Sequence, residues 1–78
     1  MEFIVKFTWH EDENIWLANS SSNNHGLVLD CNSFDGLLEK VKIVLTDIAE
    51  VDLKHEGEIK IILDVDYATV LHTSAVTA

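Results

Sequence analysis

The chain has 78 residues, a formal net charge of −9 from 14 acidic residues against five lysines, and a hydrophobic content of 47%. This length corresponds to one domain with a small core, and the apolar content is ordinary for a folded globular protein. The negative charge disfavours binding to DNA or RNA, because that binding needs cations to displace phosphate counterions. It favours either solubility alone or a basic protein partner.

Cysteine content and apolar runs predict the compartment. Cys31 is the single cysteine, which excludes an internal disulfide and a cysteine-rich metal site. Such a chain suits a reducing environment. The opening MEFIVKFTWHED lacks the basic region and long apolar core of a signal peptide. No apolar run approaches the ~20 residues of a membrane span. We therefore expect a cytoplasmic protein with no membrane segment.

The first twenty residues predict a β-hairpin. Apolar and polar residues alternate from residue 3 to residue 9, as they do in a half-buried strand. Residues 10–14 are mostly charged and match a four- or five-residue hairpin loop, so residues 15–20 form the returning strand. The side chains expected to face the core are Phe3, Val5, Phe7 and Trp9.

A polar connector separates this hairpin from a third strand. The connector reads SSSNN over residues 20–24, and the strand is predicted over residues 27–31. Gly26 precedes the strand, where we expect it to supply a backbone angle that other residues resist.

An amphipathic helix follows the third strand. Ser33 is a favourable N-cap residue, and Asp35 in the first turn suits the helix dipole. Gly36 weakens that turn, because glycine is a poor helix former. The helix should end near Glu50. Apolar residues recur at three- and four-residue steps and predict one buried stripe, formed by Phe34, Leu37, Leu38, Val41, Val44, Leu45 and Ile48.

A fourth strand is predicted over residues 59–65, where isoleucine, leucine and valine alternate with Lys60, Ile62 and Asp64. Ile62 interrupts the polar face, which indicates partial cover on both faces. A right-handed helical crossover can return this strand parallel to an inner strand.

The expected fold class is therefore α+β. We predict a β-β-β-α-β order and a four-stranded, mostly antiparallel sheet in the order 3-2-1-4, with one helix on one face. Residues 1–66 would form a single domain. Residues 67–78 would be a C-terminal tail, and the sequence leaves open whether it is another strand, an arm onto a partner, or disordered.

No group of residues predicts a catalytic, cofactor or metal site. The charged side chains of residues 10–13 are neighbours in one solvated loop, where they rarely converge on an ion. His25, His55 and His72 are scattered, and none adjoins a nucleophile with a third orienting group. Cys31 is expected to be a buried, inert thiol, because its chain neighbours offer no cation to lower its pKa.

The candidate partner interface comprises Trp9, Trp16, Asp64 and Asp66. The two tryptophans face each other across the hairpin, an arrangement typical of a core pair, although tryptophan is also enriched at binding hot spots. Asp64 and Asp66 share one strand face, where a solvated edge also accounts for them. A four-stranded sheet leaves an exposed edge, which predicts a homodimer.

The pattern TW-ED-ENIWLANS, followed by GLVLDCNSFDGLLEKVK, resembles the HicB-like antitoxin superfamily. Within it, the pattern is most similar to the short branch called domain of unknown function 1902. The resemblance covers residues 3–52 and implies a partial ribonuclease-H-like fold. It also implies a protein that neutralises a small basic ribonuclease toxin by binding it. His25 stands where many relatives have proline. The residues that carry the resemblance are Trp9, Trp16, Ala18, Gly26, Leu27, Val28, Ser33, Leu37, Leu38 and Lys40.

The resemblance also implies limits on function. Full-length relatives carry a C-terminal DNA-binding segment, for which this chain length leaves no room, so operator binding is not expected. Active nucleases of that fold place metal-binding acids on the first strand, the helix and the end of the fourth strand. Glu39 and Asp64 could occupy two of these places, but the first strand has no acid at its centre.

We therefore expect a non-catalytic protein-binding domain, with an antitoxin role implied by the resemblance. A self-associating structural or regulatory domain is the alternative, and a metal-dependent nuclease is a remote one. No cofactor is expected.

Overall fold

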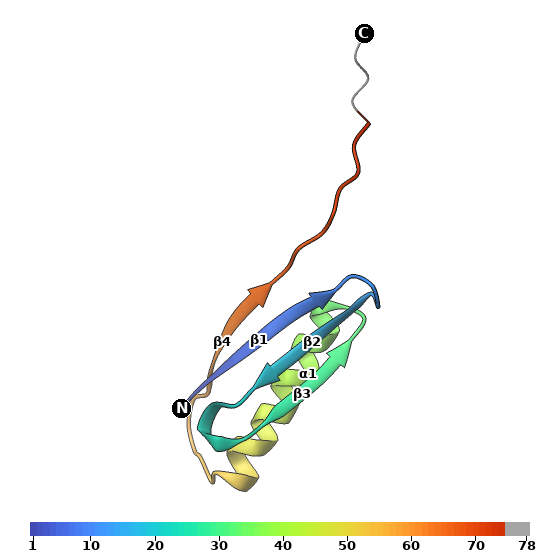
Figure 1. The fold of residues 1–78 in the computed structure, drawn as a ribbon. Coiled ribbons are helices and arrows are strands. Elements are labelled where there is room, and N and C mark those ends of the chain that lie inside the picture. Colours follow the sequence, from blue (N-terminus) through green and yellow to red (C-terminus); the bar gives the residue numbers. More distant parts are fainter. Residues whose placement is uncertain (75–78) are drawn as a thin grey trace.

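The computed structural model describes residues 1–74 as a four-stranded sheet with one helix on one face (Figure 1). The sheet order is β3-β2-β1-β4. Antiparallel pairing joins β1 to β2 and β2 to β3, whereas β4 runs parallel to β1. The α+β class, the sheet order and the single covering helix are confirmed. The elements in chain order are β1 (Glu2–His10), β2 (Ile15–Ser20), a 3-10 turn (Ser22–Asn24), β3 (Leu27–Cys31), α1 (Phe34–Asp47), a π-helical turn (Ile48–Asp52) and β4 (Lys60–Asp66).

The core lies between β1 and α1. Phe3, Val5 and Phe7 of β1 are buried, as the alternation predicts. Burying each large apolar side chain stabilises the fold by about 1.5–3 kcal/mol, so this contact decides which sheet face the helix covers. The helix supplies a matching buried stripe, formed by Leu37, Val41 and Leu45 and continued in the π-helical turn by Ala49.

The helix begins where the sequence predicts. The Ser33 side chain accepts a hydrogen bond from the Gly36 backbone N–H at 3.1 Å, which satisfies one of the free donors of the first turn. Tertiary packing also explains why residue 36 is a glycine. A Cβ atom at this position would lie 2.8 Å from both Cys31 Sγ and Ser33 Oγ. Glycine therefore allows the helix start to approach the end of β3.

The α-helix itself ends at Asp47, close to the predicted end near Glu50. Its backbone changes to π-helical hydrogen bonding from Ile48 to Asp52, and the Leu53 backbone N–H donates to the Ile48 carbonyl oxygen at 3.0 Å. The predicted end therefore falls inside this extra turn.

The polar connector holds the beginning of β1. The Ser20 hydroxyl donates to the Ile4 carbonyl oxygen at 2.7 Å, and Ser22 Oγ accepts from the Ile4 N–H at 2.9 Å. We call these two serines the serine bracket. The Asn23 side-chain amide also donates to the Glu2 carbonyl oxygen at 2.9 Å. Two serine hydroxyls and one side-chain amide N–H thus replace backbone partners where the β1–β2 ladder ends.

The expectation for Gly26 is wrong. Its φ is not in the left-handed region, and nothing within 4 Å would meet an added Cβ atom. The connector turns instead through Asn23 and Asn24, whose φ angles are 56° and 61°. Asparagine tolerates this region better than most residues, because its short side chain forms local hydrogen bonds.

Residues 67–74 form neither a helix nor a strand, and they are exposed. The start of this segment is nevertheless attached to the domain. The Tyr67 ring stacks on Trp16 with ring centroids 5.7 Å apart, and the Thr69 hydroxyl donates to Glu11 Oε1 at 2.6 Å. Beyond these contacts the chain runs away from the sheet (Figure 1). Residues 75–78 of the predicted tail lie outside the described residues.

Candidate protein-interaction surface

The sheet face opposite α1 is uncovered in the part of the chain that the structure describes. Side chains alternate between the faces of a sheet, so this open face is formed by even-numbered residues of β1, β3 and β4 and odd-numbered residues of β2. Three of its apolar side chains are solvent-exposed: Ile4 by 56%, Val28 by 72% and Ile62 by 37%. Ile4 and Ile62 are direct neighbours on adjacent strands.

Acidic side chains border this apolar surface. One row across the open face runs from Asp66 through Thr8 and Leu17 to Asp30, so it has a carboxylate on each outer strand. In the next row, Asp64 lies beside Lys6. The open face therefore combines exposed aliphatic groups with aspartates at both sheet edges.

The hairpin loop adds further negative charge beside Asp66. Glu11, Asp12 and Glu13 are all exposed between β1 and β2. Together with Asp66 they form what we call the acidic end of the molecule. Thr69 links Glu11 to the chain that follows β4, which brings this loop close to the end of that strand.

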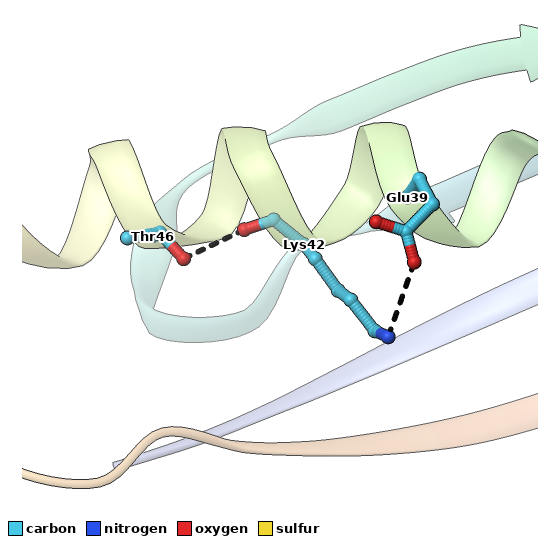
Figure 2. Close-up of polar contacts among 3 residues, drawn as sticks. All are labelled: Glu39, Lys42 and Thr46. Carbon is cyan, nitrogen blue, oxygen red and sulfur yellow. Dashed lines mark hydrogen bonds and ion pairs between the residues drawn. The ribbon is translucent and has the colours of Figure 1, made fainter.

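Few lysines oppose this charge. Lys42 pairs with Glu39 at 3.3 Å on the outer surface of α1, where the Thr46 hydroxyl also donates to the Lys42 carbonyl oxygen (Figure 2). Lys40 donates to the Asp30 backbone oxygen rather than to its carboxylate. Within residues 1–74, no ion pair includes a residue of the acidic end. The ion pairs found there are Lys42–Glu39, Lys60–Glu2 and His25–Asp52.

The two tryptophans lie on the other face of the sheet. Trp9 and Trp16 are paired across the hairpin with ring centroids 5.4 Å apart, and Phe34 of the first helical turn meets Trp16 edge-on at 5.1 Å. Both indoles are half-buried in this aromatic cluster. The Trp9 indole nitrogen is buried and has no hydrogen-bond partner among the described residues.

The structure therefore separates the four predicted interface residues into two groups. Trp9 and Trp16 lie beneath the start of α1, whereas Asp64 and Asp66 lie on the open face.

The two acids suggested for a nuclease site are also far from converging. Glu39 is exposed on the outer surface of α1, and Asp64 projects from the sheet face that α1 does not cover. The sheet thus lies between them. Within residues 1–74 there is no group of three or more histidine, cysteine or acidic side chains arranged to hold a metal ion.

The expectation for Cys31 needs correction. Hydrogen bonding from the Ser33 backbone lowers the pKa of this thiol, and the positive charge of Lys40 lowers it further, against an opposing effect of desolvation. The thiol is only partly buried. The chain neighbours of Cys31 offer no cation, but the helix brings Lys40 to it from nine positions further along the sequence.

Comparison with known protein families assigns the chain to one family. The family model described as Domain of unknown function (DUF1902) matches residues 2–75. The chain belongs to this family. The DUF1902 match includes β4, which lies beyond the residues that carried the sequence resemblance. No curated protein and no solved structure matches the chain significantly. No helix within residues 1–74 is long and apolar enough to cross a membrane.

Sequence reasoning missed most of the apolar residues that this DUF1902 domain exposes. The sequence pattern singles out neither Ile4 nor Val28 as a surface residue, although both are exposed on the open face. Leu63 and Val65 were assigned to the core face, which is their correct side, but α1 does not reach them and both are exposed. Ile62 predicts partial cover on both faces of β4, but it is 37% exposed on the face that residues 1–74 leave uncovered.

Proposed function

We propose that this chain is a non-catalytic, HicB-like protein-binding domain whose open face and acidic end bind a small basic protein. The partner implied by the antitoxin resemblance is a basic ribonuclease toxin. The observation that carries the proposal is a sheet face with exposed aliphatic side chains beside four carboxylates that form no ion pair within residues 1–74. A four-stranded sheet with one covering helix is compatible with the partial ribonuclease-H-like fold that the resemblance implies.

The two parts of the surface have different roles in this proposal. The aliphatic side chains of Ile4, Leu17 and Val28 would form the dehydrated centre of the contact, because apolar area removed from water supplies most of the affinity. The acidic end would speed the approach of a basic partner and disfavour acidic competitors. Its carboxylates are exposed, so their contribution should fall as salt screens them.

The absence of catalysis is part of the proposal. It is supported by the separation of Glu39 from Asp64 by the sheet, because two-metal chemistry needs carboxylates that converge on ions about 3.5–4 Å apart. Binding would then inhibit the partner stoichiometrically. A cytoplasmic location is also proposed, in keeping with a single unpaired cysteine.

The direct test is co-expression of the chain with the products of its adjacent reading frames, followed by pull-down and measurement of the dissociation constant. The informative variant is Asp12→Lys combined with Glu13→Lys in the exposed hairpin loop. The matched control is Asp47→Lys combined with Glu50→Lys, which makes the same change of charge on exposed positions of the helical segment.

We expect the loop variant to weaken binding by about tenfold or more and the control to have a much smaller effect. Raising the ionic strength from about 0.05 M to about 0.5 M should reduce the difference between the two variants. Equal effects of the two double variants would contradict the placement of the surface. The absence of any small basic protein among the neighbouring reading frames would remove the support for a toxin partner.

A further inference from the structure

The outer edge of β4 has no neighbouring strand in the described part of the chain. Within residues 1–74, β4 pairs only with β1. The Lys60 backbone N–H donates to the Met1 carbonyl oxygen at 2.8 Å, so the polar groups of Lys60 point towards β1. Backbone direction alternates along a strand, and the N–H and C=O groups of Ile61, Leu63 and Val65 therefore point outwards. Free edges of this kind are templates for another strand.

The side chains of this edge are apolar on the face that carries α1. Leu63 is 38% exposed and Val65 is 47% exposed, because the helix lies closest to β2 and β3, covers the buried face of β1 and does not extend across β4. The other face of β4 carries charge at Lys60, Asp64 and Asp66. The strand thus offers hydrogen-bonding groups, apolar surface and both signs of charge along one edge.

We propose that a second copy of this chain pairs its β4 with this edge, antiparallel, about a two-fold axis that passes through Leu63. Homo-oligomers are most often two-fold dimers with the same surface on both subunits. A two-fold axis that relates two antiparallel copies of one strand is perpendicular to the sheet. Each residue of β4 then faces a residue of the second copy whose side chain lies on the same face of the sheet. Because side chains alternate between faces, the axis must lie at one residue of β4, which faces its own copy.

Among the registers in which the two β4 strands overlap well, the positions of the charged residues determine at which residue the axis lies. An axis at Asp64 sets that carboxylate against its own copy, and an axis at Val65 sets Asp64 against Asp66 of the second copy. Like charges directly opposite each other destabilise a strand pair. An axis at Ile62 allows Lys60 to face Asp64, but it pairs only residues 60–64 because β4 begins at Lys60, and it leaves Asp66 towards Glu58 outside the strand. An axis at Ile61 pairs only residues 60–62, whereas an axis at Leu63 pairs the whole of β4.

The axis at Leu63 avoids every one of these conflicts. It places Lys60 of each copy opposite Asp66 of the other, an arrangement of opposite charges that stabilises a strand pair. On the helix side it places Leu63 against Leu63 and Ile61 against Val65, so all facing side chains there are apolar. The outward N–H and C=O groups of these residues then satisfy one another. The product is a continuous eight-stranded sheet with both helices on one face.

This inference does not rest on the proposed function. The two surfaces share Asp66, which belongs to the acidic end and would also face Lys60 of the second copy, whereas Glu11, Asp12 and Glu13 of the hairpin loop take no part in the strand pairing. A chain that dimerises without binding a basic protein, or that binds one as a monomer, would separate the two proposals.

The first experiment is a charge exchange across the axis. Light scattering over a concentration series should give the unaltered chain twice its mass of 8.8 kDa. Lys60→Asp and Asp66→Lys, made separately, each place like charges opposite one another and should weaken association by about tenfold. The double variant K60D/D66K restores opposite charges and should recover most of the dimer. Circular dichroism of each variant confirms that the fold is retained.

The second experiment tests the register directly. In a Cys31→Ser background, Leu63→Cys places a thiol directly opposite its own copy, within reach of a bifunctional reagent of about 5 Å. Ile61→Cys is the matched control, because the two copies of this position would be about 13 Å apart along the strands. We expect cross-linked dimers from the first variant and none from the second.

Three results would overturn the inference. An unaltered chain that keeps its monomer mass at millimolar concentration excludes the dimer. A K60D/D66K double variant that associates no better than the single variants removes the Lys60–Asp66 contact. Cross-linking that is equal at positions 61 and 63 contradicts the axis at Leu63.

Discussion

Removing the Ser20 hydroxyl should destabilise the domain. Ser20 is only 7% exposed, and its hydroxyl donates at 2.7 Å to the carbonyl oxygen of Ile4. The substitution Ser20→Ala removes this donor and leaves the Ile4 carbonyl oxygen only the longer contact from Ser22 Oγ at 3.4 Å. It also removes the oxygen that accepts from the Ser22 backbone N–H at 3.3 Å. A buried polar group left unsatisfied costs about 1–3 kcal/mol.

A loss of this size is a large fraction of the total free energy of unfolding. A chain of 78 residues is expected to unfold with a free energy of about 4–12 kcal/mol. Ser22→Ala removes the acceptor of the Ile4 N–H but leaves that group near solvent, so it should cost less, about 0.5–1.5 kcal/mol. Since both serines hold the same residue, the double variant should deviate from additivity.

The assay is equilibrium unfolding in urea, followed by the fluorescence of Trp9 and Trp16. The matched control is Ser21→Ala, at an exposed position whose side chain forms no hydrogen bond in the described chain. It should change the free energy of unfolding by less than about 0.5 kcal/mol. Equal effects of Ser20→Ala and Ser21→Ala would refute the role of the serine bracket, as would a Ser22→Ala variant that is more destabilised than Ser20→Ala.

Three further predictions follow from the packing of α1. Leu37→Ala should lower the free energy of unfolding by about 2–5 kcal/mol in the same assay, because it opens a cavity in the core; a loss below about 1 kcal/mol would show that the site is loosely packed. Gly36→Ala should destabilise by about 1 kcal/mol rather than stabilise, because its Cβ displaces the Ser33 cap; a gain in stability would show that helix propensity decides. Alkylation of Cys31 should become half-maximal at a lower pH in the folded chain than in the urea-unfolded chain, since the folded-state pKa is lowered and the thiolate is the reactive form; coincident pH profiles would contradict the contribution of Ser33 and Lys40.

Local sequence patterns were sufficient to predict the strands and the helix. Alternation defined β1, a charged loop defined the hairpin, and the three- and four-residue spacing of apolar residues defined the buried stripe of α1. These signals are local because hydrogen-bonding geometry sets the period of side chains in a strand or helix. The family match confirms the narrower part of the resemblance, the branch called domain of unknown function 1902.

Position-specific properties were not predictable in this way. Gly26 was assigned a conformation that Asn23 and Asn24 adopt instead. Cys31 was judged inert because its cationic neighbour, Lys40, reaches it only when α1 packs beside β3. The candidate interface combined residues that the fold places on opposite faces of the sheet.

The order of the strands follows from the sequence alone, because short connections join β1 to β2 and β2 to β3, and a helical crossover returns β4 beside an inner strand. The buried face of β1 also follows from it, because Phe3, Val5 and Phe7 alternate with exposed residues. What lies uncovered is decided by tertiary structure. Exposure of Leu63 and Val65 depends on how far α1 extends across β4, and the meeting of Asp66 with the hairpin loop depends on parallel pairing with β1. One helix is narrower than the four-stranded sheet beneath it, so the apolar side chains at one sheet edge stay exposed. No local pattern of residues predicts how far across the sheet the helix extends.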